Sequence, residues 1–181
     1  MSINVLGISG SLRAASHNTA TLRTAQEMAP DGMAVTIADI SAIPLYKEEV
    51  FQAGFPAAVT KLRDQIRAAD AVLIATPEYN FSFSGVLKNA IDWVSRPPSQ
   101  PFDGKIIGIV GASGGRLGTA RAQYQLRQVF VFLNGQVLNK PEVMIGGANS
   151  AFQDGKLTDA AAIKSLGDML AALATAVEKQ R

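Results

Sequence analysis

Three short runs of the chain consist almost entirely of apolar residues and show no alternation of polar and apolar positions. They are residues 3–8 (INVLGI), 71–76 (AVLIAT) and 105–112 (KIIGIVGA). Strands buried on both faces have this composition, because helices cover both sides of a parallel sheet. Weaker strand candidates occupy residues 34–38 and 143–145. The sequence therefore predicts a mainly parallel sheet of about five strands.

Each strong run leads through a loop rich in Gly, Ser or Pro into a segment with helical features. The predicted helices span residues 19–28, 56–69, 84–95, 118–133 and 159–178. In the last segment apolar residues recur at helical spacing, and Thr158 with Asp159 supplies an N-cap. Right-handed crossovers place such helices on both faces of the sheet. We expect a three-layer α/β/α sandwich formed by a single domain over residues 1–181, a length too short for two ordinary domains.

The chain has no Cys and a single His, His17. The lack of Cys excludes disulfides, thiolate metal sites, iron–sulfur clusters and cysteine nucleophiles. A single His excludes the usual catalytic zinc sites, which need two or more imidazoles. We therefore expect no metal site, and a redox activity would have to use a bound cofactor.

The chain carries 17 Lys and Arg against 15 Asp and Glu, and its basic residues form no long run. No nucleic acid partner is expected, since such proteins need a basic track for the phosphate backbone. The first residues, MSINVLGISGSLR, lack the pattern of a leader, and no segment reaches the roughly 18 to 20 apolar residues of a membrane span. These features predict a cytoplasmic, soluble protein without membrane insertion.

The loop after the first strand contains the side chains of an anion site, namely Ser11, Arg13, Ser16 and Asn18. Hydroxyl and amide groups can donate to phosphate oxygens, Arg13 adds a positive charge, and the start of the next helix presents unpaired amides. The alternative is that Ser16 or Asn18 only caps the helix and Arg13 is solvated. For His17 we expect a surface position beside this loop.

Two phosphate-binding patterns are absent from this loop. It contains neither G-x-G-x-x-G, which binds dinucleotides, nor G-x-x-x-x-G-K-[ST], which binds nucleoside triphosphates. The phosphate of a mononucleotide fits the loop better.

The third strand runs into a loop with three aromatic residues, Tyr79, Phe81 and Phe83. Aromatic side chains can stack on a flat ring while peptide groups bind its polar edge. The alternative places Phe81 and Phe83 in the core, with Tyr79 covering it. On the following helix, Lys88 and Asp92 have the i,i+4 spacing of a surface ion pair.

The fourth strand ends in a glycine-rich loop over residues 111–118. Because glycine has no side chain, backbone amides can approach a ligand closely there, although a plain tight turn would also explain the glycines. Together the three loops provide donors for a phosphate, aromatic side chains for stacking and a glycine-rich segment that leaves space for a ligand. We interpret them as a pocket for flavin mononucleotide (FMN).

Several motifs resemble those of NADPH-dependent FMN reductases, the family that includes bacterial chromate and quinone reductases. They are G-S-L-R-x-x-S-x-N, P-E-Y-N, L-K-N-A-I-D-W and S-G-G, each following a predicted strand or on the helix after it. The resemblance implies a flavodoxin-like fold with strand order 2-1-3-4-5. It also implies FMN contacts from Ser11, Arg13, Ser16, His17 and Asn18 at the phosphate, from Pro77, Glu78, Tyr79 and Asn80 along the ribityl chain and ring, and from Ser113, Gly114 and Gly115 at the ring edge.

The activity implied by the resemblance is hydride transfer from NADPH or NADH to flavin N5, followed by reduction of a quinone, flavin, chromate or other small acceptor. No catalytic side chain is expected, because the flavin carries the chemistry. Arg96 and Arg116 are candidates for binding the nicotinamide nucleotide phosphates, and the alternative for each is a solvated Arg.

Members of the family are commonly homodimers or homotetramers. The segment Gln128–Leu133 is too apolar around its circumference for a helix covered on one side, so we expect a subunit interface there, with core packing as the alternative. Arg121, Tyr124 and Glu142 are its candidate polar partners. Two other functions remain open: a flavodoxin-type electron carrier and a non-enzymatic flavin-binding sensor.

Overall fold

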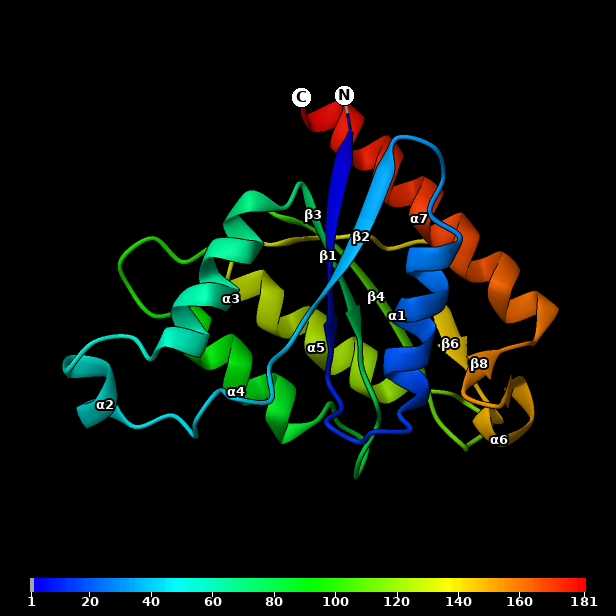
Figure 1. Cartoon of the computed structure of the whole chain (residues 1–181), viewed down its shortest axis with the longest axis horizontal. Helices are drawn as coiled ribbons and strands as arrows, with labels where there is room; N and C mark the ends of the chain where they lie inside the picture. Colours follow the sequence, from blue (N-terminus) through cyan, green and yellow to red (C-terminus); the bar gives the residue numbers. More distant parts are fainter. Residues whose placement is uncertain (1) are drawn as a thin grey trace.

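The structure, a computed structural model, describes residues 2–181. Its main sheet is parallel and has the order β2-β1-β3-β4-β5 (Figure 1). The strands are β1 (Ile3–Ser9), β2 (Met33–Ala38), β3 (Ala71–Ala75), β4 (Ile106–Ala112) and β5 (Gln136–Val137). The predicted flavodoxin-like order is thereby confirmed.

The edge of the sheet beyond β4 is built from two pieces. β5 pairs with Ile106 and Ile107 at the start of β4, and β6 (Val143–Ile145) pairs with Val110–Ala112 at its end. The sequence predicted only the second piece, because β5 has two residues and no apolar run. As a consequence, β6 brings the segment after it to the same edge of the sheet as the end of β4.

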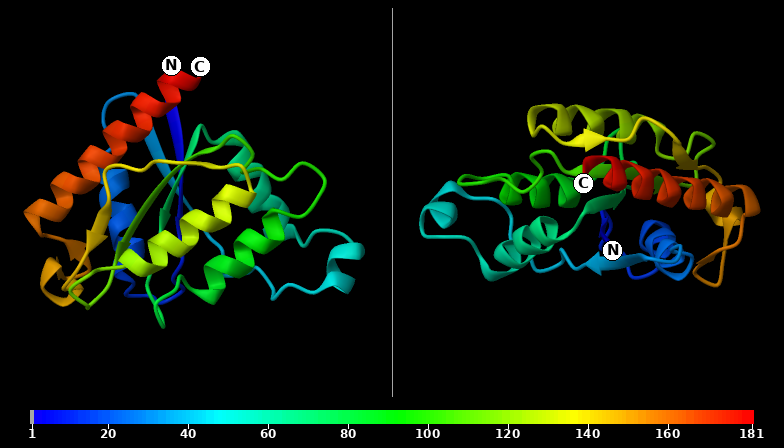
Figure 2. Two further views of the ribbon diagram at one scale, coloured as in Figure 1. Left: turned by 180° about the vertical axis from the view of Figure 1, so that it is seen from behind. Right: turned by 90° about the horizontal axis from the view of Figure 1, so that it is seen from above.

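Helices cover both faces of the sheet, as predicted. α1 (His17–Glu27) and α7 (Ala160–Gln180) pack on one face, where Leu22, Leu73 and Leu170 belong to one core cluster. α3 (Ala57–Ala68), α4 (Gly85–Val94) and α5 (Ala120–Phe132) cover the other face, and Figure 2 shows α4 and α5 crossing the sheet there. Four short elements were not predicted: α2 (Glu48–Gln52), α6 (Ala148–Ala151), β7 (Phe152–Gln153) and β8 (Lys156–Leu157).

Side chains cap the helices that begin near the carboxyl ends of the strands. The hydroxyls of Ser16 and Ser84 accept the backbone N–H of Thr19 and Leu87. Asp159 caps α7 by accepting the N–H of Ala162 at 2.8 Å, as the sequence predicted. The predicted surface pair between Lys88 and Asp92 is also present, at 2.7 Å.

The expectation that no segment is long and apolar enough for a membrane span was wrong. Within the described part of the chain, α7 meets that criterion by length and composition. Its many alanines raise the mean hydropathy without forming a continuous run of large apolar residues. Leu166, Met169, Leu170, Leu173 and Val177 of α7 are buried against the sheet and α1, so its apolar face packs within the protein.

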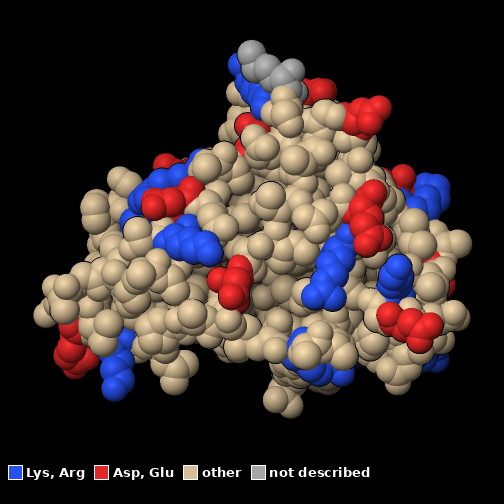
Figure 3. All heavy atoms as spheres, in the orientation of Figure 1, with Lys and Arg blue, Asp and Glu red and all other residues tan. Residues whose placement is uncertain are grey.

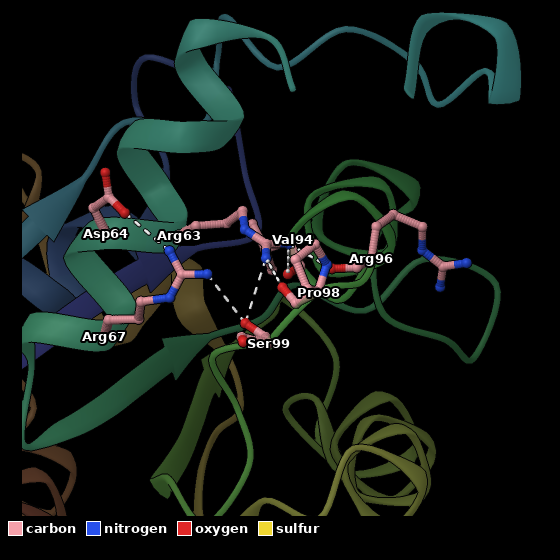
Figure 4. A network of polar contacts seen from close by, with 7 residues as sticks. All are labelled: Arg63, Asp64, Arg67, Val94, Arg96, Pro98 and Ser99. Atoms are coloured by element: carbon pink, nitrogen blue, oxygen red, sulfur yellow. Dashed lines mark hydrogen bonds and ion pairs between the residues drawn. The ribbon is translucent and has the colours of Figure 1, made fainter. Parts of the chain in front are cut away.

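One buried charge was not predicted. Arg63 on α3 is 3% exposed, and its guanidinium donates to the backbone carbonyls that follow α4 rather than to a carboxylate (Figure 4). The acceptors are the carbonyl oxygens of Val94, Arg96, Pro98 and Ser99, at 2.8, 2.6, 2.6 and 3.4 Å. This cation therefore fixes the loop between α4 and β4 at the end of the sheet opposite the predicted site.

Candidate functional site

The loops after β1, β3 and β4 meet at the carboxyl edge of the sheet and enclose a cavity of about 270 Å³. Most of the residues that the sequence predicted for the cofactor line it: Ser11, Arg13, Ser16, His17, Asn18, Pro77, Glu78, Tyr79, Ser113 and Gly114, joined by Ala112 and Asn149. The other predicted residues, Asn80 and Gly115, line an adjoining cavity of about 700 Å³ that shares Glu78, Ser113 and Gly114 with the first. The structure thus brings the predicted set together.

The loop over residues 10–16 presents backbone amides to the smaller cavity. The backbone N–H groups of Ser11 and Arg13 donate to the hydroxyls of Ser9 and Ser11, at 3.3 and 3.4 Å. Within residues 2–181, no acceptor pairs with the amides of Ala14 and Ala15. The hydroxyl of Ser16 accepts from Thr19 and keeps its own proton free to donate. These unpaired donors at a helix start, with the exposed Arg13 guanidinium nearby, suit an anion.

Asn18 has a second role that its position in the sequence did not reveal. Its side-chain Nδ2 donates to the carbonyl of Ala112 at 3.1 Å, and its Oδ1 accepts the Ala112 amide at 2.9 Å. Both atoms of this buried amide are therefore engaged at the end of β4. Asn18 holds α1 against β4 and thereby joins the loop over residues 10–16 to the start of the glycine-rich loop.

His17 lies at the rim of the cavity with its ring against Phe152, the ring centroids being 4.6 Å apart. Burial, and then the positive charge of Arg13, lower the pKa of His17 below its usual 6.5. The imidazole is therefore neutral at neutral pH. Asn149 also faces this cavity, and sequence analysis missed it together with Phe152. The Gly146–Gly147 turn that directs the chain back after β6, with Gly147 at φ 56°, was the available signal.

Glu78, predicted as a cofactor residue, anchors the loop after β3. Its carboxylate accepts the backbone N–H groups of Arg121 and Ala122, at 3.0 and 3.1 Å, and pairs with the Arg121 guanidinium at 3.1 Å. The N-cap residue of α5, Thr119, makes no side-chain cap of its own. Glu78 supplies that cap from 43 residues away, and a negative charge is favourable at a helix start.

Residues 79–82 form a tight hairpin next to Glu78. The N–H and carbonyl of Tyr79 pair with the carbonyl and N–H of Ser82, at 2.9 and 3.0 Å. The two central residues, Asn80 and Phe81, have φ values of 51° and 67°. Positive φ at both positions is typical of a type I′ turn, and a bulky residue rarely adopts it. The turn therefore holds Phe81 in a strained conformation beside the cavities.

The alternative that places Phe81 in the core is wrong. Its side chain is 61% exposed, because the hairpin directs it away from the sheet. The Arg121 guanidinium lies 4.0 Å from the centre of its ring, and Gln125 donates to its carbonyl oxygen at 3.0 Å. Phe83 is partly buried and packs on the core, and Tyr79 is exposed. Two aromatic rings thus border the cavities.

Two glycines near the end of β4 differ in the space available for a side chain. A Cβ at Gly111 would overlap Thr119 Oγ1 and the carbonyl oxygen of Thr76, so only glycine fits there. A Cβ at Gly114 would meet nothing within 4 Å, and the φ of Gly114 is not positive. The fold itself therefore does not require glycine at position 114. Gly114 lines both cavities, so a side chain at this position would fill space that a ligand can use.

The two arginines predicted for the nicotinamide nucleotide lie in different places. Arg116 lines the larger cavity together with Arg121. Arg96 follows the last turn of α4, donates to the Asp92 carbonyl at 2.9 Å and lines neither cavity. α4 begins beside the site, and ten helical residues span about 15 Å, which carries its end away from the site. The structure does not bring Arg96 to the predicted set.

The residues present fit FMN. The unpaired amides and Arg13 match a phosphate, while the exposed hairpin and the open position at Gly114 leave space for a flat ring. The two adjoining cavities, of about 270 and 700 Å³, match the usual size of a cofactor site. Over residues 2–181 there is no group of three His, Cys, Asp or Glu side chains arranged to hold a metal ion.

Comparison with known proteins gives consistent matches. The sequence model described as NADPH-dependent FMN reductase matches residues 3–150. An NAD(P)H-dependent FMN reductase of Pseudomonas aeruginosa is 59% identical over 99% of this chain and 97% of its own length. A quinone reductase of Escherichia coli K12 is 45% identical over 98% and 96%. A solved flavoenzyme NAD(P)H:(acceptor) oxidoreductase from Paracoccus denitrificans superposes with a TM-score of 0.88 at 34% identity, covering 98% of each chain.

Proposed function

This chain belongs to the NADPH-dependent FMN reductase family, and from that premise we propose which residues hold its cofactor and which acceptors it reduces. The protein is an oxidoreductase that uses FMN and NAD(P)H. Quinones are its acceptor class, with free flavins and chromate as further small acceptors. The main support for the proposal is that the loop with unpaired amides (residues 10–16) and the glycine-rich loop (residues 113–118) line two adjoining cavities.

The phosphate of FMN binds to the loop over residues 11–18. The free amides of Ala14 and Ala15 and the hydroxyl of Ser16 donate to its oxygens, and Arg13 balances its charge. His17 stays neutral and borders the phosphate, while Asn18 holds the loop against Ala112. The same side chains cap the helix and bind the phosphate, so the two interpretations of Ser16 do not compete.

The ribityl chain and ring lie between the segment Pro77–Asn80 and the rim Ser113–Gly115. When bound, FMN accepts a hydride from NAD(P)H and passes the electrons to the acceptor. Glu78 holds the hairpin in place, and Gly114 leaves room at the ring edge. The larger cavity stays open beside Phe81, so it can admit first the nicotinamide and then a flat acceptor such as a quinone. Arg116 lies in the same cavity, where it can bind a nucleotide phosphate.

The protein assembles as a homodimer or homotetramer through the exposed face of α5. Val131 and Phe132 on that face are 80% and 88% exposed. Tyr124 lies on the same face and donates to Glu142 at 2.6 Å. Arg121, another expected interface residue, pairs with Glu78 within the chain. Large apolar side chains at this exposure are typical of a subunit contact.

The protein acts as a soluble enzyme in the cytoplasm. The apolar face of α7 is covered by the sheet and α1, which supports this location. Exposed ion pairs such as Lys164 with Asp168 lie on its outer face.

Anaerobic spectroscopy of the purified protein tests the proposal. The visible flavin absorption is recorded after FMN is added, NADPH is then mixed in, and benzoquinone follows. We expect rapid bleaching by NADPH and full recovery of the bands with benzoquinone. Bands that NADPH does not bleach would favour an electron carrier or a sensor. A protein that takes up no FMN would contradict the whole proposal.

A further inference from the structure

A second hollow lies on the other side of the 11–14 loop from the FMN cavities, between that loop and the end of β2. Its volume is about 340 Å³. Ser11 and Arg13 line both this hollow and the smaller FMN cavity. The remaining polar lining comes from Ser9, Thr19, Arg23, Asp39 and Ser41. Ser11 and Arg13 therefore border both spaces.

Two guanidinium groups converge on the hollow without a protein partner. Neither Arg13 nor Arg23 donates a side-chain hydrogen bond or forms an ion pair anywhere in residues 2–181. Arg67, Arg121 and Arg181, by contrast, each pair with a carboxylate. Figure 3 shows basic side chains over α1 and near the β1–α1 loop on this face. Unpaired guanidinium groups next to hydroxyls are suited to a phosphate.

The hollow is also lined by one carboxylate, that of Asp39. Asp39 directly follows β2, and its Oδ1 accepts the Ser41 amide at 2.9 Å. Hydrogen bonds from Ser41 lower the pKa of Asp39 below its usual 3.8, so the carboxylate is charged at neutral pH. A single fixed carboxylate beside two arginines matches a group that carries both a phosphate and a free hydroxyl.

We propose that this hollow binds a phosphorylated ribose, specifically the adenosine ribose of NADPH with its 2′-phosphate on Arg23 and its 3′-hydroxyl on Asp39. The proposal rests on the proposed function, because the nicotinamide end must then reach the larger cavity. It assigns the preference between NADPH and NADH to Arg23, a residue outside the FMN cavities.

Calorimetric titration of the FMN-saturated protein with adenosine 2′,5′-bisphosphate tests the assignment, with ADP and inorganic phosphate as comparison ligands. We expect Arg23→Gln to weaken adenosine 2′,5′-bisphosphate binding about tenfold, the loss of one charge-assisted hydrogen bond. Arg23→Lys should retain most of the affinity. The control Lys164→Gln removes the same charge from the exposed face of α7 and should leave the affinity unchanged. In steady-state assays, Arg23→Gln should raise the ratio of KM for NADPH to KM for NADH.

Three results would overturn the proposal. If Arg23→Gln lowered the affinities for ADP and adenosine 2′,5′-bisphosphate equally, Arg23 would not bind the 2′-phosphate. If Arg116→Gln lowered the affinity for adenosine 2′,5′-bisphosphate and Arg23→Gln did not, the 2′-phosphate would bind in the larger cavity instead. Inorganic phosphate that competes as well as the nucleotide would mean a plain anion site. The calorimetry needs no turnover, so a failure of NADPH to bleach the flavin would contradict the proposed function and leave this test readable.

Discussion

The Glu78 carboxylate and the Arg121 guanidinium lie 3.1 Å apart, and the same carboxylate accepts the backbone N–H of Arg121 at 3.0 Å. This relationship joins the loop after β3 to the first turn of α5. The Glu78 side chain is only 9% exposed, so water competes weakly for it. The hairpin and the helix that follows the glycine-rich loop are thereby held together, and both border the proposed FMN site.

Glu78→Gln should lower the free energy of unfolding by about 1 to 2 kcal/mol, because it removes a charged cap and one ion-pair partner. It should also weaken FMN binding, since the hairpin is released from α5. Urea unfolding and fluorescence titration with FMN measure the two effects. The control Glu178→Gln changes an exposed carboxylate near the end of α7. Unchanged FMN affinity in Glu78→Gln would show that the hairpin does not depend on this anchor.

Gly111→Ala should lower the stability of the protein, whereas Gly114→Ala should lower only its affinity for FMN. Alanine at position 111 overlaps Thr119 and Thr76, and overpacking of this kind costs about 1 to 3 kcal/mol or more. Alanine at position 114 meets nothing in the protein, so thermal stability of the FMN-free form should be unchanged while FMN affinity falls. Thermal melts with and without FMN separate the two. Wild-type FMN affinity in Gly114→Ala would exclude this position from the ring edge.

Arg63→Met should destabilise the protein by about 3 kcal/mol, because the buried carbonyls after α4 lose their shared donor. Lys61→Met is the matched control, because Lys61 is an exposed cation on the same helix, α3. Substitutions at exposed positions usually change stability by about 0.5 kcal/mol or less, so the control should change little. Urea unfolding gives the energies, and hydrogen exchange of the backbone amides of Ser95, Arg96 and Ser99 should rise only in Arg63→Met.

Asp70 should make stability depend on acidic pH. Its carboxylate accepts the Asn4 amide at 2.8 Å and pairs with Arg181, the last residue of the chain, at 3.1 Å. These contacts, the Asn4 amide first, lower the pKa of Asp70 below 3.8. A lowered folded-state pKa gives stabilisation that is present above the usual value and is lost as pH falls through the folded value.

The wild type should therefore lose stability on acidification below about pH 4, and Asp70→Asn should lose less over the same range. Urea unfolding between pH 2 and pH 7 measures the slopes. Asp31→Asn, at an exposed position between α1 and β2, serves as the control. An identical slope in wild type and Asp70→Asn would contradict this account.

Phe132→Lys should dissociate the assembly, because it puts a charge in the apolar face of α5. Sedimentation velocity should show a shift from the wild-type dimer or tetramer toward the monomer. Leu45→Lys changes an equally exposed apolar residue outside α5 and should leave the assembly intact. A wild-type protein that sediments as a monomer would refute the proposed interface.

Local patterns in the amino-acid sequence encode the strands, the helices and the loops at the end of the sheet. Apolar runs predicted the parallel strands, and helical spacing with N-cap residues predicted helices whose ends lie within two residues of the observed ones. Motif spacing predicted the loops that line the two cavities. These features follow from the side chains of neighbouring residues. Because parallel strands end at one edge of a sheet, the residues predicted after β1, β3 and β4 had to meet there.

The hydrogen-bond partner of each polar side chain, by contrast, depends on the tertiary structure. Glu78 finds its donors 43 residues away and Asn18 finds Ala112 94 residues away. Phe81 is exposed because a strained turn directs it outward, and Arg96 is removed from the site by the length of α4. Such pairings depend on how distant elements pack, and packing is set by the summed burial of the whole chain, which no local spacing in the sequence encodes.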